Sequence, residues 1–365
     1  GSKKNRRRKD NNIIWFWGND CKYEVITDKV DSLGWKIVDD DKKEAKCNLF
    51  WVDVSTIHER LRSVLPWQIV NHFPGMTNIA RKNRMGQNLN KFQKLFPREF
   101  NFYPKTWVLP HELTDFRNQF DHAGNSLGGK VFILKPDTGC QGKGIFLTKS
   151  WDNVPTMDNW VAQVYMKKPL LIDGFKFDLR IYVFVTCVKP LRMYLFQDGL
   201  VRICSEEYVK PTKANIHMTQ MHLTNYAVNK NNANFHQPGE AQAEDGSKRA
   251  VAWFMDWIRE DWGDEKADRL WRRIGNISVK TLLTILPTLS REYEQSFKSF
   301  NNGMMFRGSR CFEVLGLDIM IDSKLNPWMI EVNHLPSFGT DSPLDLDIKE
   351  RLMDEVFDCL HVLPD

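Results

Sequence analysis

Two short segments near the carboxyl end of the chain alternate apolar residues with polar or small ones. The first covers residues 315–322, the second covers residues 328–333, and the polar stretch SKLNP separates them. Alternation with a period of two is the pattern of a β-strand with two different faces, and Ser, Asn and Pro favour the turn of a hairpin. This pair of segments therefore predicts a two-stranded antiparallel unit, which is the strongest constraint on the fold.

The register of this hairpin decides which polar residues meet. If the turn centres on Lys324 and Leu325, Asp318 lies directly opposite Glu331, and Asn333 falls on the same face two residues along. A loop of two or four residues gives this register, whereas an odd loop shifts it. Two opposed carboxylates repel each other unless a cation lies between them, and three oxygen donors favour Mg²⁺ bridging nucleotide phosphates. A solvent-exposed face with incidental acidic residues is the alternative.

A glycine-rich segment lies between two expected strands. Residues 135–145 read KPDTGCQGKGI, and the flanking strands are expected at 131–135 and 145–148. Three glycines in six residues let backbone N–H groups approach an anion closely, and Lys135 and Lys143 add positive charge. The glycine spacing matches neither of the two common nucleotide-binding patterns. A plain glycine-rich hairpin is therefore the alternative to a phosphate-binding loop.

Charged residues alternate at the start of another expected strand, 177–188. Lys176, Asp178 and Arg180 are two residues apart, so their side chains point to one face. Such a face is either the wet edge of a sheet or a ligand site. Arg202 lies on a short strand candidate, and taken alone it reads as a surface arginine.

The remaining pattern divides the chain into three blocks of mixed strands and helices. Further strands are expected at 13–17, 49–53, 106–109, 160–165, 192–196 and 200–203, and helices at 249–262, 276–297 and 347–360. The segment 222–226, HLTNY, supplies hydroxyl, amide and phenol groups for a ligand or simply caps a neighbouring element. The polar stretch 229–248 reads as a mobile loop. This arrangement predicts an α+β fold with more than one domain.

Composition narrows the class of protein without identifying a partner. The chain has 365 residues, 42% of them hydrophobic and 27% charged, which is typical of a folded protein. The longest apolar run is too short to span a membrane, and no segment resembles a signal peptide. Seven scattered cysteines without a C-x-x-C spacing fit a reducing cytosol better than a disulfide framework or a zinc site.

The charge distribution adds one feature. The formal net charge of +5 mildly favours an acidic partner. A basic run at 3–9 follows Gly1 and Ser2, which we interpret as the remnant of a cleaved tag. The run is either a solvated leader or an arm that attracts an acidic polymer.

Several long motifs, in order, resemble the tubulin tyrosine ligase-like family, whose catalytic core has an ATP-grasp fold. The motifs are KPDTGCQGKGI at 135–145, KPLLIDG at 168–174, KFDLRIYV at 176–183, MHLTNY at 221–226 and EVN at 331–333. The resemblance runs from about 71 to 338 and is weaker over the first hundred residues. It implies a central ATP-grasp domain at 103–164 and a C-terminal ATP-grasp domain at 165–365, preceded by an N-terminal α/β domain at 13–102. Residues 1–12 are then the tag remnant and the basic leader.

The resemblance also implies roles for individual residues. The residues implied for ATP are Lys135, Gln141, Gly142, Lys143, Gln163, Val164, Tyr165, Met166, Lys176, Phe177, Asp178, Thr224 and Asn225. The residues implied for the incoming amino acid or the acceptor are Gln141, Arg180, Arg202, Tyr226, Lys248 and His334. Arg180, Arg202 and Glu331 are the implied catalytic residues, and Asp318, Glu331 and Asn333 are the implied Mg²⁺ ligands, in agreement with the hairpin argument.

The activity implied by the resemblance is an ATP- and Mg²⁺-dependent ligation of glutamate to glutamate residues or chains on tubulin tails, through an acyl phosphate. Ile181 and Tyr182 follow Arg180 and are similar to the glutamate-adding branch, because the glycine-adding branch more often has Gln-Trp and the tyrosine ligase Ser-Trp there. His334 after Asn333 resembles the members that lengthen existing glutamate chains.

The implied partners are free L-glutamate and tubulin or microtubules, with no membrane and no nucleic acid, and the protein is expected to be a monomer. The expected location is the cytoplasm and cytoskeleton, including the cilium axoneme or basal body. Two alternatives are a sibling ligase that uses glycine or tyrosine and an inactive microtubule-binding module. The complete set of Asp318, Glu331 and Asn333 argues against the inactive module.

Overall fold

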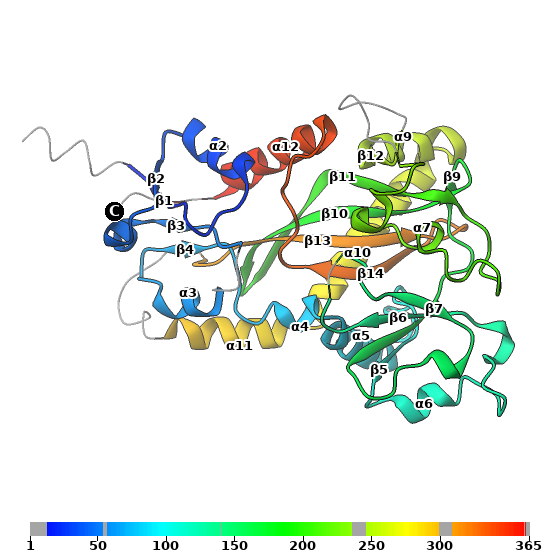
Figure 1. Cartoon of the computed structure of the whole chain (residues 1–365). Coiled ribbons are helices and arrows are strands. Elements are labelled where there is room, and N and C mark those ends of the chain that lie inside the picture. The colour runs from blue at the N-terminus through cyan, green and yellow to red at the C-terminus, as the bar shows by residue number, and fades with distance from the viewer. Residues whose placement is uncertain are drawn as a thin grey trace, which may run out of the picture.

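The computed structural model describes residues 13–53, 57–139, 141–235, 246–298, 309–360 and 362. Within these residues the strands form three separate sheets, with helices on their faces and ends (Figure 1). The expected mixture of strands and helices is therefore confirmed. The basic run at 3–9 lies outside the described residues. None of the described helices is long and apolar enough to cross a membrane.

The N-terminal sheet is parallel. Its strand order is β2 (Lys36–Val38), β1 (Trp15–Trp17), β3 (Leu49–Phe50) and β4 (Ile69–Val70). Parallel neighbours need crossover connections, and α2 (Glu24–Ser32), the 3₁₀ helix Asp41–Lys46 and α3 (Ile57–Ser63) lie in these connections. The strands expected at 13–17 and 49–53 are present but shorter, while β2 and β4 are too short to show alternation in the sequence.

The central sheet is antiparallel. Its strand order is β5 (Thr106–Leu109), β8 (Trp160–Val164), β6 (Phe132–Pro136) and β7 (Phe146–Thr148), and all four lie within one residue of their expected bounds. The helices α4 (Thr77–Ala80) and α5 (Lys82–Leu95) precede this sheet, and α6 (Leu113–Arg117) follows β5. Trp107, Phe116 and Phe132 form the centre of its own small core.

The third sheet, called the large sheet, is built from long antiparallel strands. Its order is β12 (Lys248–Ala250), β11 (Leu191–Glu207), β10 (Phe175–Val188), β13 (Glu313–Ile321) and β14 (Pro327–Asn333), with β9 (Leu171–Ile172) paired to β10. Two short helices, α7 (Thr219–His222) and α8 (Tyr226–Asn229), follow β11. The large sheet carries the hairpin that the sequence predicts, as β13 and β14.

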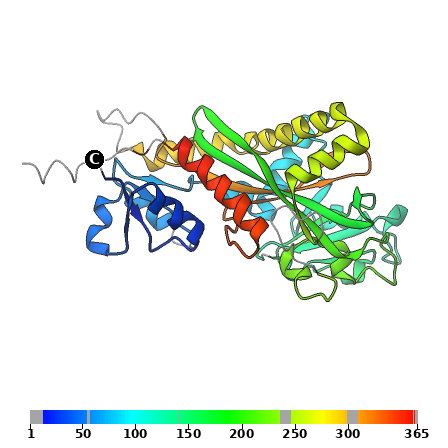
Figure 2. The ribbon, with the colours of Figure 1, turned by 90° about the horizontal axis from the view of Figure 1, so that it is seen from above.

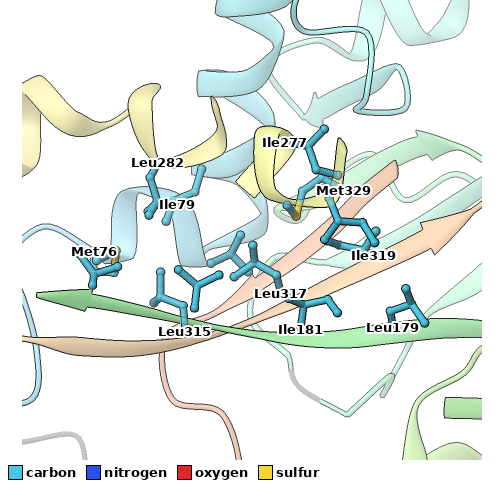
Figure 3. Close-up of a cluster of buried hydrophobic side chains, with 14 of the residues drawn as sticks. Met76, Ile79, Leu179, Ile181, Ile277, Leu282, Leu315, Leu317, Ile319 and Met329 are labelled. Atoms are coloured by element: carbon cyan, nitrogen blue, oxygen red, sulfur yellow. The ribbon is translucent and has the colours of Figure 1, made fainter. Parts of the chain in front are cut away.

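One face of the large sheet is apolar along its length. Leu179, Ile181, Leu317 and Ile319 lie on this face and belong to one buried cluster. Figure 3 shows them against Ile277 of α10 and other apolar side chains. The helices that cover this face are α9 (Val251–Trp262), α10 (Asp264–Leu283) and α11 (Leu286–Ser296).

The opposite face of the large sheet is divided between two environments. One end is apolar: Tyr182, Phe184 and Val314 pack against α12 (Pro343–Cys359) and the N-terminal sheet. Figure 2 shows α12 crossing this side while α9 and α10 run along the other. The other end of the same face carries the charged residues described below.

Three predictions about the large sheet and its helices are wrong in detail. The expected strands at 192–196 and 200–203 are one continuous strand, β11. The helix expected at 276–297 is two helices, because α10 begins at Asp264 and ends before α11 starts. The early turns of α10 carry many exposed charges, so the apolar periodicity of this part of the helix was not recognised in the sequence. Lys248 starts β12 instead of ending a loop, and residues 236–245 lie outside the described residues.

Candidate active site

The predicted pairing of Asp318 with Glu331 is present, but the predicted loop geometry is wrong. Ile321 pairs with Pro327, so the connection has an odd number of residues and by itself would place Ile330 opposite Asp318. A register shift between Asp318 and Ile319 adds one residue to β14 and brings Glu331 opposite Asp318. A β-bulge of this kind is a common way to re-aim a side chain near an active site.

Charged side chains form a row across the large sheet. Directly opposite residues on neighbouring strands share a face, and the register pairs Lys248 with Arg202, Arg202 with Asp178, Arg180 with Asp318, and Asp318 with Glu331. Arg180 is two residues from Asp178 and so lies on the same face. We call these six residues the charged row. It runs through every strand of the sheet from β12 to β14.

Strong ion pairs connect the middle of the charged row. Arg180 Nε lies 2.6 Å from Asp318 Oδ1, and Arg202 Nη2 lies 2.9 Å from Asp318 Oδ2. Arg202 also donates to both carboxylate oxygens of Asp178 at 2.8 and 2.5 Å. Burial alone raises the pKa of Asp318, but the two guanidinium groups outweigh it and hold the pKa at about 2. The carboxylate therefore stays ionised inside the protein.

These contacts exclude two alternatives that the sequence left open: a wet sheet edge at residues 176–180 and a surface position for Arg202. Asp178 and Lys176 are almost fully buried, and β10 lies in the middle of the sheet, so the charged strand is not a wet edge. The Arg202 side chain is only 11% exposed and bridges two carboxylates, so it is not a surface arginine.

Two buried lysines lie beside the row and have neutral hydrogen-bond partners. Lys135 Nζ donates to Gln163 Oε1 at 3.0 Å, and Lys176 Nζ donates to the Tyr165 hydroxyl at 3.1 Å and to the carbonyl of His222. Burial lowers the pKa of each lysine to about 8. Among the described residues no carboxylate lies within 4 Å of either ammonium group. Such groups favour an anionic ligand, because a buried unpaired charge is costly.

The glycine-rich segment and the row meet at a small pocket. Its lining includes Gly139, Gln141, Gly142 and Lys143 from the segment and Glu331 from β14. Gly142 has a φ of 79°, and a side chain on it would come within 2.8 Å of Val228 Cγ2 and 3.0 Å of Asn225 Oδ1. Glycine is therefore required there both by the backbone conformation and by the close approach of α8.

Lys82, the first residue of α5, completes this pocket and was not predicted. Its ammonium group lies 3.3 Å from Glu331 Oε1 and donates to the carbonyl of Gly139 at 2.8 Å. Asp137 in the glycine-rich segment accepts a hydrogen bond from the backbone of Asn83 and so caps α5. A cation in the first turn of a helix opposes the helix dipole. That unfavourable placement is the one signal in the sequence that could have marked Lys82.

The other residues of the predicted ATP site lie in different environments, some at the charged face and one in the apolar core. Thr224 donates to Asp178 at 2.7 Å, and Tyr165 bonds Lys176, so both contact the charged face. Val164 and Met166 are half-buried at the end of β8 and just beyond it. Phe177 differs: its ring packs 5.4 Å from that of Phe254 in the apolar core, because it alternates with Lys176 and Asp178. Only its backbone remains available for a nucleotide.

His334 and Lys248 lie at opposite sides of the site. His334 directly follows β14 and lines a small pocket with Asp53, His72 and Phe338, between the N-terminal and large sheets. Its ring centre lies 6.3 Å from that of His72. The ammonium group of Lys248 lies 4.2 Å from the ring centre of Tyr226 and 2.8 Å from Asp345 Oδ2.

The hairpin residues suit a hard divalent cation in their chemistry. Asp318, Glu331 and Asn333 present carboxylate and amide oxygens on adjacent strands, which are the donors that Mg²⁺ prefers. The described residues contain no cluster of three His, Cys, Asp or Glu side chains that could hold a metal by themselves. Asn333 and the ligand's own oxygens would therefore have to complete the coordination.

Comparison with known proteins identifies the family. The Tubulin-tyrosine ligase family matches residues 59–365, which is most of the chain. The chain belongs to this family. The family resemblance stated from the sequence motifs is thereby confirmed.

Similar proteins carry names that describe one modification. A protein of Danio rerio named "Tubulin polyglutamylase ttll6" is 40% identical over 93% of this chain and 41% of its own length. A "Probable beta-tubulin polyglutamylase" of Tetrahymena thermophila is 43% identical over 91% of this chain and 27% of its own length. The human "Tubulin polyglutamylase TTLL13" is 40% identical over 96% of this chain and 41% of its own length. The chain thus spans less than half the length of these relatives.

Proposed function

We propose that this chain is the catalytic part of an ATP- and Mg²⁺-dependent ligase that adds glutamate to the acidic C-terminal tails of tubulin. The observation that carries the proposal is the charged row, which faces two buried lysines without carboxylate partners beside a glycine-rich pocket. Cations without carboxylate partners beside a glycine-rich loop suit phosphate groups. The names of the relatives support tubulin as the substrate and glutamate as the added residue.

The proposed fold is an ATP-grasp fold. The antiparallel central and large sheets would hold ATP between them, with the central domain at 103–164 and the C-terminal domain at 165–365. The N-terminal α/β domain at 13–102 would lie beside the acceptor. These divisions agree with the resemblance and with the position of the pocket between β14 and the glycine-rich segment.

In this proposal Lys135, Lys176, Lys82 and the glycine-rich segment hold the ATP phosphates. The end of β8, from Gln163 to Met166, would contact adenine, and Asp178 the ribose. Asp318, Glu331 and Asn333 would hold Mg²⁺, which neutralises phosphate charge when it is bound. Arg180 and Arg202 would orient the acceptor carboxylate, because each is itself held in position by Asp318 or Asp178.

The proposed reaction has two steps. An oxygen of the acceptor carboxylate attacks the γ-phosphorus of ATP, the bond to ADP breaks, and an acyl phosphate forms. The amine of free glutamate then attacks the acyl carbon, loses a proton, and releases inorganic phosphate as the amide forms. Buried guanidinium groups stabilise the negative charge that develops on the acyl oxygen more strongly than water does.

Glutamate is the proposed donor because Ile181 and Tyr182 follow Arg180. Ile181 lies in the apolar core and Tyr182 is buried beside the charged row, so neither contacts a donor as a charged group. Discrimination against glycine and tyrosine would therefore come from a cation that binds the donor's side-chain carboxylate.

The deciding experiment is incubation of the protein with microtubules, ATP, Mg²⁺ and each labelled amino acid, followed by mass spectrometry of the tails. Successive additions of glutamate are the expected result. Additions of glycine or tyrosine instead would identify a sibling ligase, and no addition by a folded protein would favour a binding module. The protein would act at the cytoskeleton, including the cilium.

His334 is the proposed basis for lengthening existing glutamate chains. It directly follows Asn333 and lines a pocket beside the N-terminal sheet, where an imidazole could hydrogen-bond the carboxylate at the end of a chain. Two tail peptides test this, one unmodified and one with a single branch glutamate. Faster addition to the unmodified peptide contradicts the proposal, as does a His334→Leu variant with an unchanged preference.

A further inference from the structure

A buried group of three charged residues lies at the β12 end of the charged row, and the activity described above does not account for all of it. Lys248 Nζ lies 2.8 Å from Asp345 Oδ2, and Lys349 Nζ lies 2.9 Å from Asp345 Oδ1. All three residues are at most 6% exposed. Two ammonium groups therefore share one carboxylate inside the protein.

The carboxylate of Asp345 is held in place by the start of α12. Ser342 is the N-cap residue of this helix, and its hydroxyl accepts the backbone N–H of Asp345 at 3.2 Å and donates to Asp345 Oδ2 at 2.7 Å. The Ser342 hydroxyl thus satisfies one backbone N–H in the first turn of α12 and also holds the Asp345 carboxylate. Burial alone raises the pKa of Asp345, but Lys349 and Lys248 outweigh it and keep the pKa below its ordinary value. Asp345 is thus a fixed, ionised acceptor.

Lys248 has contacts on two sides that restrict where its ammonium group can lie. Asp345 is on one side, and the Tyr226 ring is on another at 4.2 Å from its centre. On the strand, Lys248 is directly opposite Arg202 and shares its face. A flexible lysine is thereby held at the β12 end of the row that contains the proposed catalytic arginines.

The charges of the row support a carboxylate ligand at this end. Arg180 and Arg202 are balanced by Asp318 and Asp178, whereas Lys248 and Lys349 have one carboxylate between them. The buried group thus carries one positive charge in excess, which is unfavourable unless an anion is bound. A free amino acid that binds beside Lys248 at this end of the row brings such an anion.

We propose that Asp345 is a positioning residue that holds the Lys248 ammonium group for a carboxylate of the donor amino acid. The proposal rests on the proposed ligase function, because Lys248 is there assigned to the incoming amino acid. Asp345 itself does not contact the donor. It acts through Lys248, and Lys349 supplies the second charge that keeps the group cationic overall.

The test compares Asp345→Asn with a control on the same helix. Arg351 of α12 binds Asp198 of β11 at 2.7 Å and so also ties the helix to the sheet, but away from the row. Arg351→Gln is therefore the matched control for loosening of α12. Both variants and the unchanged protein are titrated calorimetrically with L-glutamate, in the presence of Mg²⁺ and a non-hydrolysable ATP analogue, and the analogue is titrated separately.

The expected result is that Asp345→Asn weakens L-glutamate binding by at least about tenfold, or ~1.4 kcal/mol, with analogue affinity within about twofold of the unchanged protein. In the tail assay the KM for glutamate rises while kcat at saturating glutamate stays within about threefold. Arg351→Gln lowers the melting temperature and leaves both affinities unchanged. A parallel titration with L-glutamine, which lacks the second carboxylate, distinguishes the side-chain carboxylate from the α-carboxylate as the group bound.

Two results overturn the proposal. One is unchanged L-glutamate affinity in a folded Asp345→Asn protein. The other is an equal loss of glutamate and analogue affinity in both variants, which a purely structural role of α12 predicts. If Asp345→Asn does not fold, Lys248→Gln replaces it, because Asp345 then keeps Lys349 and Ser342 as partners. Unchanged glutamate binding by Lys248→Gln overturns the proposal as well.

The same experiment separates this inference from the proposed function. If the unchanged protein adds no glutamate to tails, the proposed function is wrong. The calorimetric titration does not depend on tail modification and still decides the role of Asp345.

Discussion

The two faces of the large sheet are made by the same strands but bury different kinds of side chain. On one face Leu179, Leu317 and Ile319 are buried by helices α9 to α11. On the other face their neighbours in sequence, Asp178 and Asp318, are also buried but are paired with the guanidinium groups of Arg180 and Arg202. Burial alone therefore does not distinguish a core from a site. The difference is whether the buried groups are satisfied by apolar contact or by opposite charge.

The comparison predicts that neighbouring residues of one strand affect different properties. A change on the apolar face alters the free energy of unfolding and leaves the chemistry intact, since side chains on that face point away from the row. A conservative change at Glu331 or Gly316 on the charged face alters ligation and changes stability little.

Leu317→Ala should lower the free energy of unfolding by about 3–5 kcal/mol. Leu317 is 2% exposed at the centre of the apolar cluster, so the variant loses transfer free energy and leaves a cavity. Urea denaturation gives the change in stability, and the tail assay on the folded fraction gives kcat. A large loss of kcat with little loss of stability would break the distinction between the faces.

Glu331→Gln should reduce ligation by at least about a hundredfold while the protein stays folded. The variant keeps the shape of the side chain but removes a charge that the proposed metal site and Lys82 both need. Glu99→Gln is the matched control, because Glu99 pairs with Lys280 at 2.7 Å on the surface. Near-normal turnover in Glu331→Gln, or an equal loss in the control, would contradict the metal-hairpin proposal.

Lys135→Met should make the protein more stable than the unchanged protein at pH 7.5, and this difference in the free energy of unfolding should narrow by roughly 2 kcal/mol by pH 10. Burial lowers the pKa of Lys135 to about 8 in the folded protein, whereas in the unfolded chain the pKa has its ordinary value of 10.5. Between these values the unfolded chain binds more protons, so the stability of the unchanged protein rises with pH. The variant has no such group and shows no corresponding rise.

Urea denaturation at several pH values measures this difference. Lys266→Met, which removes an exposed lysine of α10, is the matched control for loss of one lysine. If the difference in the free energy of unfolding between Lys135→Met and the unchanged protein stayed constant from pH 7.5 to pH 10, the pKa of Lys135 would not be near 8. The same deprotonation predicts that the affinity for ATP falls above pH 8, since phosphate binding needs the charged lysine.

Gly316→Ala should lower kcat only a few-fold and change the free energy of unfolding by less than about 1 kcal/mol. Gly316 lies on the charged face next to Leu317, and a side chain on it would come within 3.0 Å of Arg180 Cδ and of Pro336 Cβ. The methyl group would push the Arg180 guanidinium away from Asp318. Kinetics and denaturation of this variant beside Leu317→Ala provide the sharpest test, because the two residues are adjacent. A loss of stability as large as that of Leu317→Ala would contradict the prediction.

The sequence predicted much of the site because the relevant patterns are local. Alternation along residues 315–322 and 328–333 identified the hairpin and its two faces, and the alternation of Lys176, Asp178 and Arg180 placed their side chains on one side of a strand. Four strands of the central sheet were predicted within one residue for the same reason. Strands β2 and β4, with two or three residues each, carry too little alternation to detect.

The correct pairing of Asp318 with Glu331 was predicted for a wrong reason. The connection has an odd length, and a bulge at Ile330 restores the pairing. A bulge depends on how β14 packs against its neighbours, so no turn rule applied to residues 323–327 could include it. The predicted outcome and the observed geometry agree only because two deviations cancel.

What the sequence by itself determined is which residues are apolar, which are charged, and which face of its own strand each one occupies. Only the tertiary structure decided the partners: that Arg202 bridges Asp178 and Asp318, that Lys82 from α5 reaches Glu331, and that Asp345 from α12 holds Lys248. The physical reason is range. Side-chain direction in a strand repeats every two residues and is set locally, whereas these ion pairs, which join residues as far as 249 positions apart, depend on strand order and helix packing.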